Sequence, residues 1–197
     1  LKINDKNLWK INCEYISENY DKSFYKYFTQ YHNNNYSMID YLFSIIYKIE
    51  FIDKETNKII STRYENCYML DIALISTSLE QCIDNHFKDE SLDKENDNQY
   101  YDDKRNIYID VIKRTRIHRL PKIMTIQLKR WNMNLRKNQR IIHFENENMD
   151  ISKYISCNYE KNDNNYNLFG IINHSGNIFG GHYTSIVKNY NNKWYNY

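Results

Sequence analysis

His182 directly follows the last glycine of the chain's only glycine cluster. The four glycines among the 197 residues are Gly170, Gly176, Gly180 and Gly181. At average usage, roughly 7%, a chain of this length would hold about 14 glycines. Because glycine is scarce elsewhere, the cluster predicts a backbone with positive φ or a close approach by another chain. A histidine there suits proton transfer near neutral pH, since its ordinary pKa is about 6.5. The residues alone equally allow a structural histidine beside a tight hairpin.

The surrounding sequence predicts how this histidine is presented. We expect one strand to end at His174, a flexible loop to run from Ser175 to Gly181, and the next strand to open at His182. A histidine at a strand start beside such a loop is well placed to meet a substrate. His174 is a weaker candidate, because its ring is expected to hydrogen-bond only within the loop.

The cysteines give no nucleophile or metal motif by spacing. Cys13, Cys67, Cys82 and Cys157 stand alone, without a C-x-x-C pair. We expect free structural thiols and a reducing compartment. Cys82 and His86 are four residues apart, a spacing that could bind a metal, but a position on the apolar face of a helix favours core packing.

Apolar spacing predicts an α+β fold that would carry these residues. Phe24, Tyr27, Phe28 and Tyr31 recur at helical spacing, and the capping pattern of Thr77 with Glu80 predicts a second helix. The remaining apolar segments predict strands within 41–53, 59–60, 67–75, 107–112, 123–128, 141–144, 166–173, 183–188 and 193–197.

Composition excludes several classes of function. The chain has 27 basic and 25 acidic residues, so we predict no nucleic-acid partner and interpret the basic residues 113–116 as a solvated face. The acidic residues 89–103 are predicted to be a mobile insertion. Neither a signal peptide nor an apolar run of about 18 residues is present, so we predict no membrane span. The first residue is Leu1, and we expect a fragment or an excised domain.

Two motifs resemble the ubiquitin-specific proteases, a family of papain-like cysteine enzymes. Residues 120–131, which read LPKIMTIQLKRW, resemble the family's palm strand L-P-x-x-L-x-I-x-L-K-R-F. Residues 166–197 resemble its histidine box, with N-H-S-G, G-G-H-Y and W-Y-x-Y. The resemblance covers roughly residues 39–197 and implies the fingers and palm of a catalytic domain, with antiparallel sheets and few helices. Residues 1–38 match poorly and are expected to be partly helical.

This resemblance implies a deubiquitinating cysteine protease that cleaves the isopeptide bond after the ubiquitin C-terminal glycine. His182 would be the general base, and Ser175, Gly176, Gly180 and Gly181 would form a substrate-binding loop over the ubiquitin tail.

Three departures from the family pattern narrow this expectation. The family's G-N-T-C-Y box is not found, so the nucleophile is expected outside the chain. The residue that orients the histidine would follow Tyr197, and alternation is expected to point Asn196 elsewhere. The C-x-x-C pairs that hold zinc in many relatives would fall near residues 50–53 and 102–105, where there are none, so we predict no metal and no cofactor.

The implied partners are ubiquitin and ubiquitinated proteins, and the implied location is the cytoplasm or nucleus. Two alternatives to the deubiquitinating protease stay open. The first is a non-catalytic ubiquitin-binding relative, and the second is a papain-like protease with another substrate. The residues do not distinguish ubiquitin from a ubiquitin-like modifier.

Overall fold

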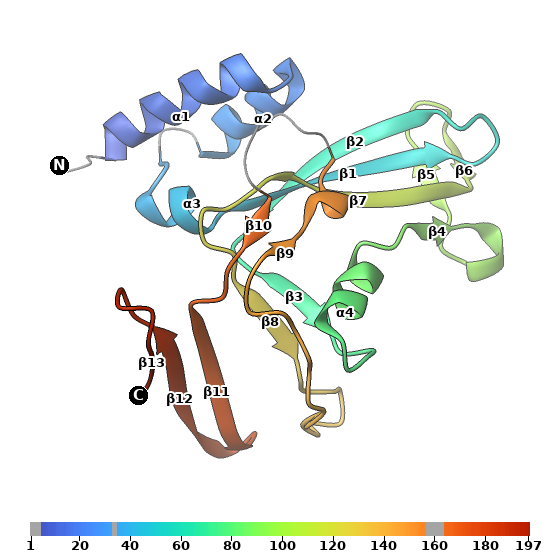
Figure 1. The fold of residues 1–197 in the computed structure, drawn as a ribbon. Coiled ribbons are helices and arrows are strands. Elements are labelled where there is room, and N and C mark those ends of the chain that lie inside the picture. The colour runs from blue at the N-terminus through green and yellow to red at the C-terminus, as the bar shows by residue number, and fades with distance from the viewer. Residues whose placement is uncertain (1–4, 33–34, 157–163) are drawn as a thin grey trace.

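The computed structural model describes residues 5–32, 35–156 and 164–197 (Figure 1). Cys157, predicted to be a free thiol, lies outside these ranges. The helices are α1 (Asp5–Asn19), α2 (Lys22–His32), α3 (Met38–Phe43) and α4 (Leu79–His86). The strands are β1 (Ile45–Asp53), β2 (Ile59–Cys67), β3 (Leu70–Ala73), β4 (Glu90–Leu92), β5 (Tyr100–Asp102), β6 (Ile107–Ile109), β7 (Val111–Arg119), β8 (Ile126–Lys129), β9 (Met149–Asp150), β10 (Asn165–Tyr166), β11 (Gly170–Asn177), β12 (Gly180–Lys188) and β13 (Trp194–Asn196).

The largest sheet has four strands in the order β2-β1-β7-β4, all paired antiparallel. Its long strands extend from the helical end of the molecule to the small β5–β6 hairpin (Figure 1). Among the named strands of the described chain, one pair is parallel: β3 with β8. The α+β class with mainly antiparallel strands is therefore confirmed.

The N-terminal helices pack one side of this sheet through aromatic rings. α2 confirms the helix that the aromatic spacing predicted, and Phe24 and Phe28 are fully buried in it. Trp9 of α1 stacks on Phe28 with ring centroids 5.5 Å apart, and Ile46 of β1 closes the cluster. Burial of this kind contributes roughly 1.5–3 kcal/mol per large apolar side chain.

Helix α3 was not predicted, because its last residues were assigned to the strand that follows. Ser37 and Asp40 form a reciprocal capping box: the Asp40 amide donates to the Ser37 hydroxyl, and the Ser37 amide donates to the Asp40 carboxylate. This cap fixes a helical turn through residues 41–43 and delays the start of β1 to Ile45.

A second core lies under α4 and contains Ile45, Ile72 and Ile117, all fully buried. Cys82 is also buried there, at 1% exposure, as expected for a core thiol. No group of three or more potential metal ligands occurs among the described residues. The cap of α4 is Ser78, one residue after the predicted Thr77.

The predicted strand at residues 141–144 is wrong. His143 makes only an isolated bridge to Ser78: its amide donates to the Thr77 carbonyl (2.7 Å), and its carbonyl accepts from the Leu79 amide (2.9 Å). The segment therefore binds the start of α4 by two backbone hydrogen bonds without extending into a ladder.

The acidic segment 89–103 has regular structure, contrary to the predicted mobile insertion. It contains β4 and β5, and β4 pairs with β7. Asp89 lies 3.0 Å from Arg114 and 3.0 Å from Arg116, both on β7. Ion pairs and backbone pairing with β7 order the segment, and they also occupy part of the basic face.

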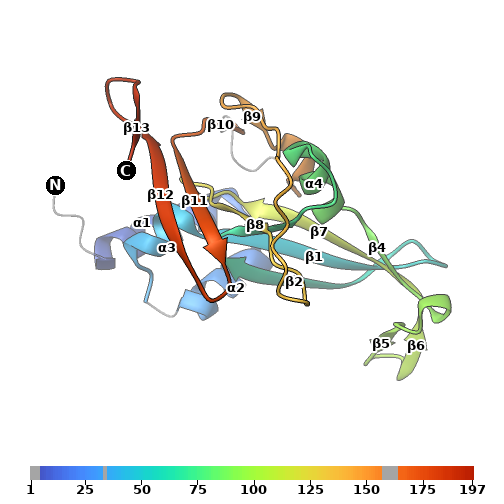
Figure 2. The same ribbon diagram turned by 90° about the horizontal axis from the view of Figure 1, so that it is seen from below.

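The last three strands form a separate sheet in the order β11-β12-β13, which projects from the body of the molecule (Figures 1 and 2). The three predicted strands are confirmed, but the first begins at Gly170, because residues 167–169 interrupt it after the short β10. No helix among the described residues has the length and apolar character needed to cross a membrane.

Candidate active site

Ser175 to Gly181 form the closed end of the β11–β12 hairpin, and the predicted flexible loop is wrong. Ser175 pairs with His182, Gly176 with Gly181, and Asn177 with Gly180. Two residues at the turn, Ile178 and Phe179, remain outside the ladder, and Phe179 is 94% exposed. His182 is accordingly the third residue of β12 and does not open it.

Two of the glycines are required by the hairpin itself. Gly176 has φ +122°, and a Cβ there would lie 2.5 Å from the Gly180 carbonyl oxygen. A Cβ at Gly181 would collide with the His174 ring and the Ser175 carbonyl. At Gly180, by contrast, a Cβ would meet no atom within 4 Å. Of these three glycines, Gly180 is the one that internal packing does not explain.

His182 presents an exposed imidazole beside this turn. Ser175, directly opposite, donates a long hydrogen bond from its hydroxyl to the His182 carbonyl (3.4 Å). Among the described residues, no hydrogen bond, ion pair or ring contact involves the imidazole itself. Both ring nitrogens are thus available to a substrate or to another side chain.

Asn196 shares a face with His182, which corrects the expectation from alternation. Asn196 pairs with Ile186 of β12. Directly opposite residues of an antiparallel pair share a face, and so do residues two apart along a strand. Ile186 is four residues after His182, so Asn196 lies roughly 13 Å along the strand at about 3.3 Å per residue. Distance, and not direction, prevents it from orienting the His182 ring.

His174 contacts residues outside the hairpin, so its expected role within a loop is also wrong. Lys137 Nζ lies 3.0 Å from His174 Nδ1 and also donates to the His174 carbonyl. The His174 ring lies 4.7 Å from the Tyr183 ring and 6.2 Å from the Trp131 ring, centroid to centroid. Sequence reasoning missed Lys137, because it stands in the polar segment 132–139, where no periodicity marks it.

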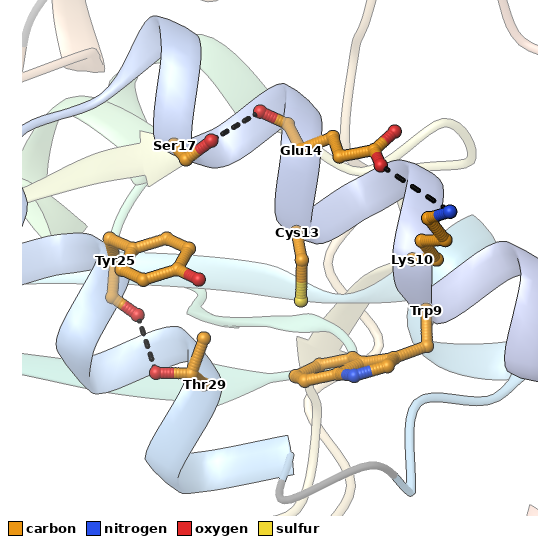
Figure 3. Close-up of a pocket in the computed structure, with 7 residues that line it drawn as sticks. All are labelled: Trp9, Lys10, Cys13, Glu14, Ser17, Tyr25 and Thr29. Atoms are coloured by element: carbon orange, nitrogen blue, oxygen red, sulfur yellow. Dashed lines mark hydrogen bonds and ion pairs between the residues drawn. The ribbon is translucent and has the colours of Figure 1, made fainter.

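The described cysteines lie away from His182. Cys67 and Cys82 pack with the core under α4. Cys13 faces a pocket of about 480 Å³ lined by Trp9, Lys10, Cys13, Glu14, Ser17, Tyr25 and Thr29 (Figure 3). Figure 1 shows α1, which carries Cys13, well separated from the β11–β12 turn. Burial, and then the charge of Glu14, raise the pKa of the Cys13 thiol, the reverse of what activates a nucleophile.

Ion pairs connect β1 to the β5–β6 hairpin at the far end of the large sheet. Arg105 lies 2.9 Å from Asp53 and 3.0 Å from Asp102, at the positions where the C-x-x-C pairs of many relatives were sought. Asp53 also accepts hydrogen bonds from the amides of Glu55 and Thr56, both 2.9 Å. These donors hold the pKa of Asp53 below its usual range.

Solved structures define the class of this fold. In the SAGA Ubp8/Sgf11/Sus1/Sgf73 DUB module bound to ubiquitin aldehyde, the similar chain has a TM-score of 0.66 and 22% identity, over 98% of this chain and 47% of that chain. A SAGA DUB module bound to monoubiquitin gives a TM-score of 0.69 and 22% identity, over 98% and 46%. The fold is that of ubiquitin-specific protease catalytic domains.

The sequence comparison then gives the family. The model described as ubiquitin carboxyl-terminal hydrolase matches residues 6–197, so the chain belongs to that family. The match includes most of residues 1–38, where the motifs had shown little resemblance.

Curated relatives with similar sequences carry the same family description. Ubiquitin carboxyl-terminal hydrolase 8 of Arabidopsis thaliana is 32% identical over 125 residues, which is 62% of this chain and 14% of that protein. Ubiquitin carboxyl-terminal hydrolase 19 of the same plant is 34% identical over 142 residues, 69% of this chain and 20% of that protein. The chain thus spans a fifth or less of these two relatives.

Proposed function

We propose that the protein is a deubiquitinating cysteine protease with His182 as general base. The observation that carries this proposal is the position of His182: an exposed, unpaired imidazole beside a glycine turn, within a chain that matches the hydrolase family over residues 6–197. A histidine of this kind can exchange protons with both a nucleophile and a leaving group near neutral pH.

In the proposed reaction, His182 takes the proton of a cysteine thiol supplied from outside residues 1–197. The thiolate attacks the carbonyl carbon of the ubiquitin C-terminal glycine, and the C–N isopeptide bond breaks. The lysine amine of the modified protein leaves with the proton from His182. Water then hydrolyses the thioester, which releases ubiquitin and restores the thiol.

Residues 175–181 would border the extended ubiquitin tail. Gly180 is the best candidate for direct contact, because its open surroundings leave room for a peptide. We propose that residues 39–197 form the fingers and palm and that residues 1–38 are an N-terminal segment that is partly helical. The aromatic cluster joins the two parts through Ile46. Ubiquitin and ubiquitinated proteins are the proposed partners, in a reducing compartment of the cytoplasm or nucleus.

The test compares His182→Ala with His143→Ala, a matched exposed histidine, in the full-length protein. Loss of a general base should lower kcat/KM for ubiquitin cleavage about 100-fold or more, with ubiquitin binding retained. His143→Ala should leave cleavage within about twofold. A decrease of less than about threefold for His182→Ala would show that another group is the base.

A second candidate is a ubiquitin-binding relative without catalysis. It is favoured by the absence of any contact between His182 and the described cysteines, Cys13, Cys67 and Cys82. An electrophilic ubiquitin probe distinguishes the two functions. Covalent labelling of the full-length protein supports the protease, whereas binding without labelling supports the second candidate.

A further inference from the structure

The sheet that carries His182 is joined to the rest of the molecule at two places. Among the described residues, hydrogen bonds, ion pairs and ring contacts link it at its base and near its turn. At the base, Lys188 lies 3.3 Å from Glu147, and the Leu168 amide donates to the Asn146 carbonyl (2.8 Å). Near the turn, the contacts are those of His174 with Lys137 and Trp131. Strand β11 is mostly exposed, so these contacts determine where the hairpin lies.

The contact of Lys137 with His174 has a defined chemistry. A lysine ammonium only donates hydrogen bonds, so His174 Nδ1, 3.0 Å away, must be the acceptor. The tautomer that fits this contact has its proton on Nε2. The same ammonium donates to the His174 carbonyl and lies 5.9 Å from the centroid of the Trp131 ring. Three interactions converge on one cation.

The segment that presents Lys137 is held by its own hydrogen bonds. Trp131 and Lys137 form an antiparallel bridge. Within the turn, the Asn132 amide donates to the Arg136 carbonyl (3.1 Å), and the Asn132 side chain accepts from the Arg136 amide (2.9 Å). At its base, Arg130 donates to the carbonyls of residues 138 (3.1 Å) and 140 (2.8 Å). This closed turn provides a fixed support for the ammonium.

We infer that Lys137 and His174 form a clasp that positions the hairpin, and with it His182. The His174–Tyr183 pair lies next to the Ser175–His182 pair in the ladder, with the two histidines on opposite faces. A shift of the clasp would therefore move the His182 backbone. A displacement of about 1 Å in a catalytic group can cost about 100-fold in rate. Both residues are positioning residues, and only their effect on catalysis rests on the function proposed above.

The direct test is hydrogen exchange of the backbone amides in residues 131–138 and 170–183 of the full-length protein. Lys137→Met removes the ammonium while keeping much of the apolar stem, and we expect exchange in both segments to rise about tenfold. Lys193→Met is the matched control, because Lys193 is an exposed lysine in the turn between β12 and β13, and no contact of its side chain with the described residues is found. It should leave exchange unchanged.

Substitutions of His174 separate the clasp from general packing. His174→Asn keeps an acceptor near the Nδ1 position and should retain most of the protection, whereas His174→Ala should lose it. The double variant of Lys137→Met and His174→Ala should exchange no faster than either single variant, since residues of one interaction are not additive. In a long-range ¹H–¹⁵N spectrum, His174 Nδ1 should be unprotonated in the wild-type protein.

The outcomes also separate the clasp from the proposed function. If Lys137→Met exchanges like Lys193→Met, or if Nδ1 carries the proton, the clasp is refuted even when ubiquitin cleavage is observed. If exchange rises as expected while neither wild type nor variant cleaves ubiquitin, the clasp is supported and the protease proposal fails. With both correct, Lys137→Met should lower kcat at least tenfold and change KM by less than about threefold.

Discussion

Replacing the hairpin glycines one at a time by alanine should separate internal packing from substrate contact. At Gly176, an alanine at φ +122° carries backbone strain of about 1–3 kcal/mol. Its Cβ would also lie 2.5 Å from the Gly180 carbonyl oxygen and 2.6 Å from Gly181 Cα, which adds about 1–3 kcal/mol of overpacking. The hairpin should therefore be destabilised by about 2–6 kcal/mol, an increase in local opening of roughly 30-fold or more.

The other two positions provide the comparison. Gly181→Ala forces the His174 ring away and should cost about 1–3 kcal/mol. Gly180→Ala meets no atom within 4 Å, so stability should change by less than about 1 kcal/mol. Amide exchange in residues 170–188 measures the opening, and cleavage of a ubiquitin substrate by the full-length protein measures the function.

Amide exchange and ubiquitin cleavage, compared among the three variants, show which glycines serve internal packing and which border the substrate. We expect Gly180→Ala to reduce cleavage without increasing amide exchange, because the added methyl group would occupy space left for the peptide. If Gly180→Ala increased exchange as much as Gly176→Ala, the steric reasoning would be refuted. If Gly180→Ala left cleavage unchanged, Gly180 would not border the substrate.

Three further predictions concern pH and the orientation of the site. Burial lowers the pKa of His32 to about 4, so between about pH 6.5 and pH 4 the unfolded chain binds a proton at His32 and the folded chain does not. The free energy of unfolding should therefore fall by up to about 3 kcal/mol over this range. In an acid titration of unfolding, His32→Gln should show a smaller fall. Hydrogen bonds from Thr56 and Arg105 lower the pKa of Asp53, so its carboxylate stabilises the fold above about pH 3.9, and this stabilisation is lost as pH falls further. Asp53→Asn should therefore be less stable than the wild type at pH 7, and its stability should depend less on acid pH. Asn196→Ala should leave ubiquitin cleavage within about twofold, and a tenfold loss in a kinetic assay would contradict the register.

Predictions from the sequence succeeded where a structure depends on neighbours in the chain. The rings of Phe24 and Phe28 lie one turn apart, so α2 could be recognised from spacing alone. The capping box of Ser37 with Asp40 was equally local, and α3 could have been predicted from it. At the glycines, composition indicated positive φ or a close approach by another chain, and the structure shows positive φ at Gly176. At Gly181 the crowding atoms belong to His174 and Ser175 of the same hairpin.

Other features depend on partners far along the chain and could not be predicted. Lys137 and His174 are 37 positions apart, and neither stands in a pattern that predicts a contact. Asp89 is ordered by Arg114, 25 positions later, so an acidic composition wrongly suggested mobility. The distance from His182 to Asn196 follows from strand register, which a single sequence does not specify.

The aromatic cluster and the core under α4 also differ in when they can form during synthesis on the ribosome. The buried residues of the aromatic cluster end at Ile46, whereas the core under α4 needs Tyr154, and β3 must wait for β8 to pair. The chain grows N-terminus first at roughly 5–20 residues per second, so the 108 positions from Ile46 to Tyr154 take roughly 5–20 s. Leu70 and Ile72 of β3 wait for β8, which begins at Ile126, 54 positions after Ile72 and therefore roughly 3–11 s later. During that wait the nascent chain presents an unpaired apolar strand that chaperones can bind.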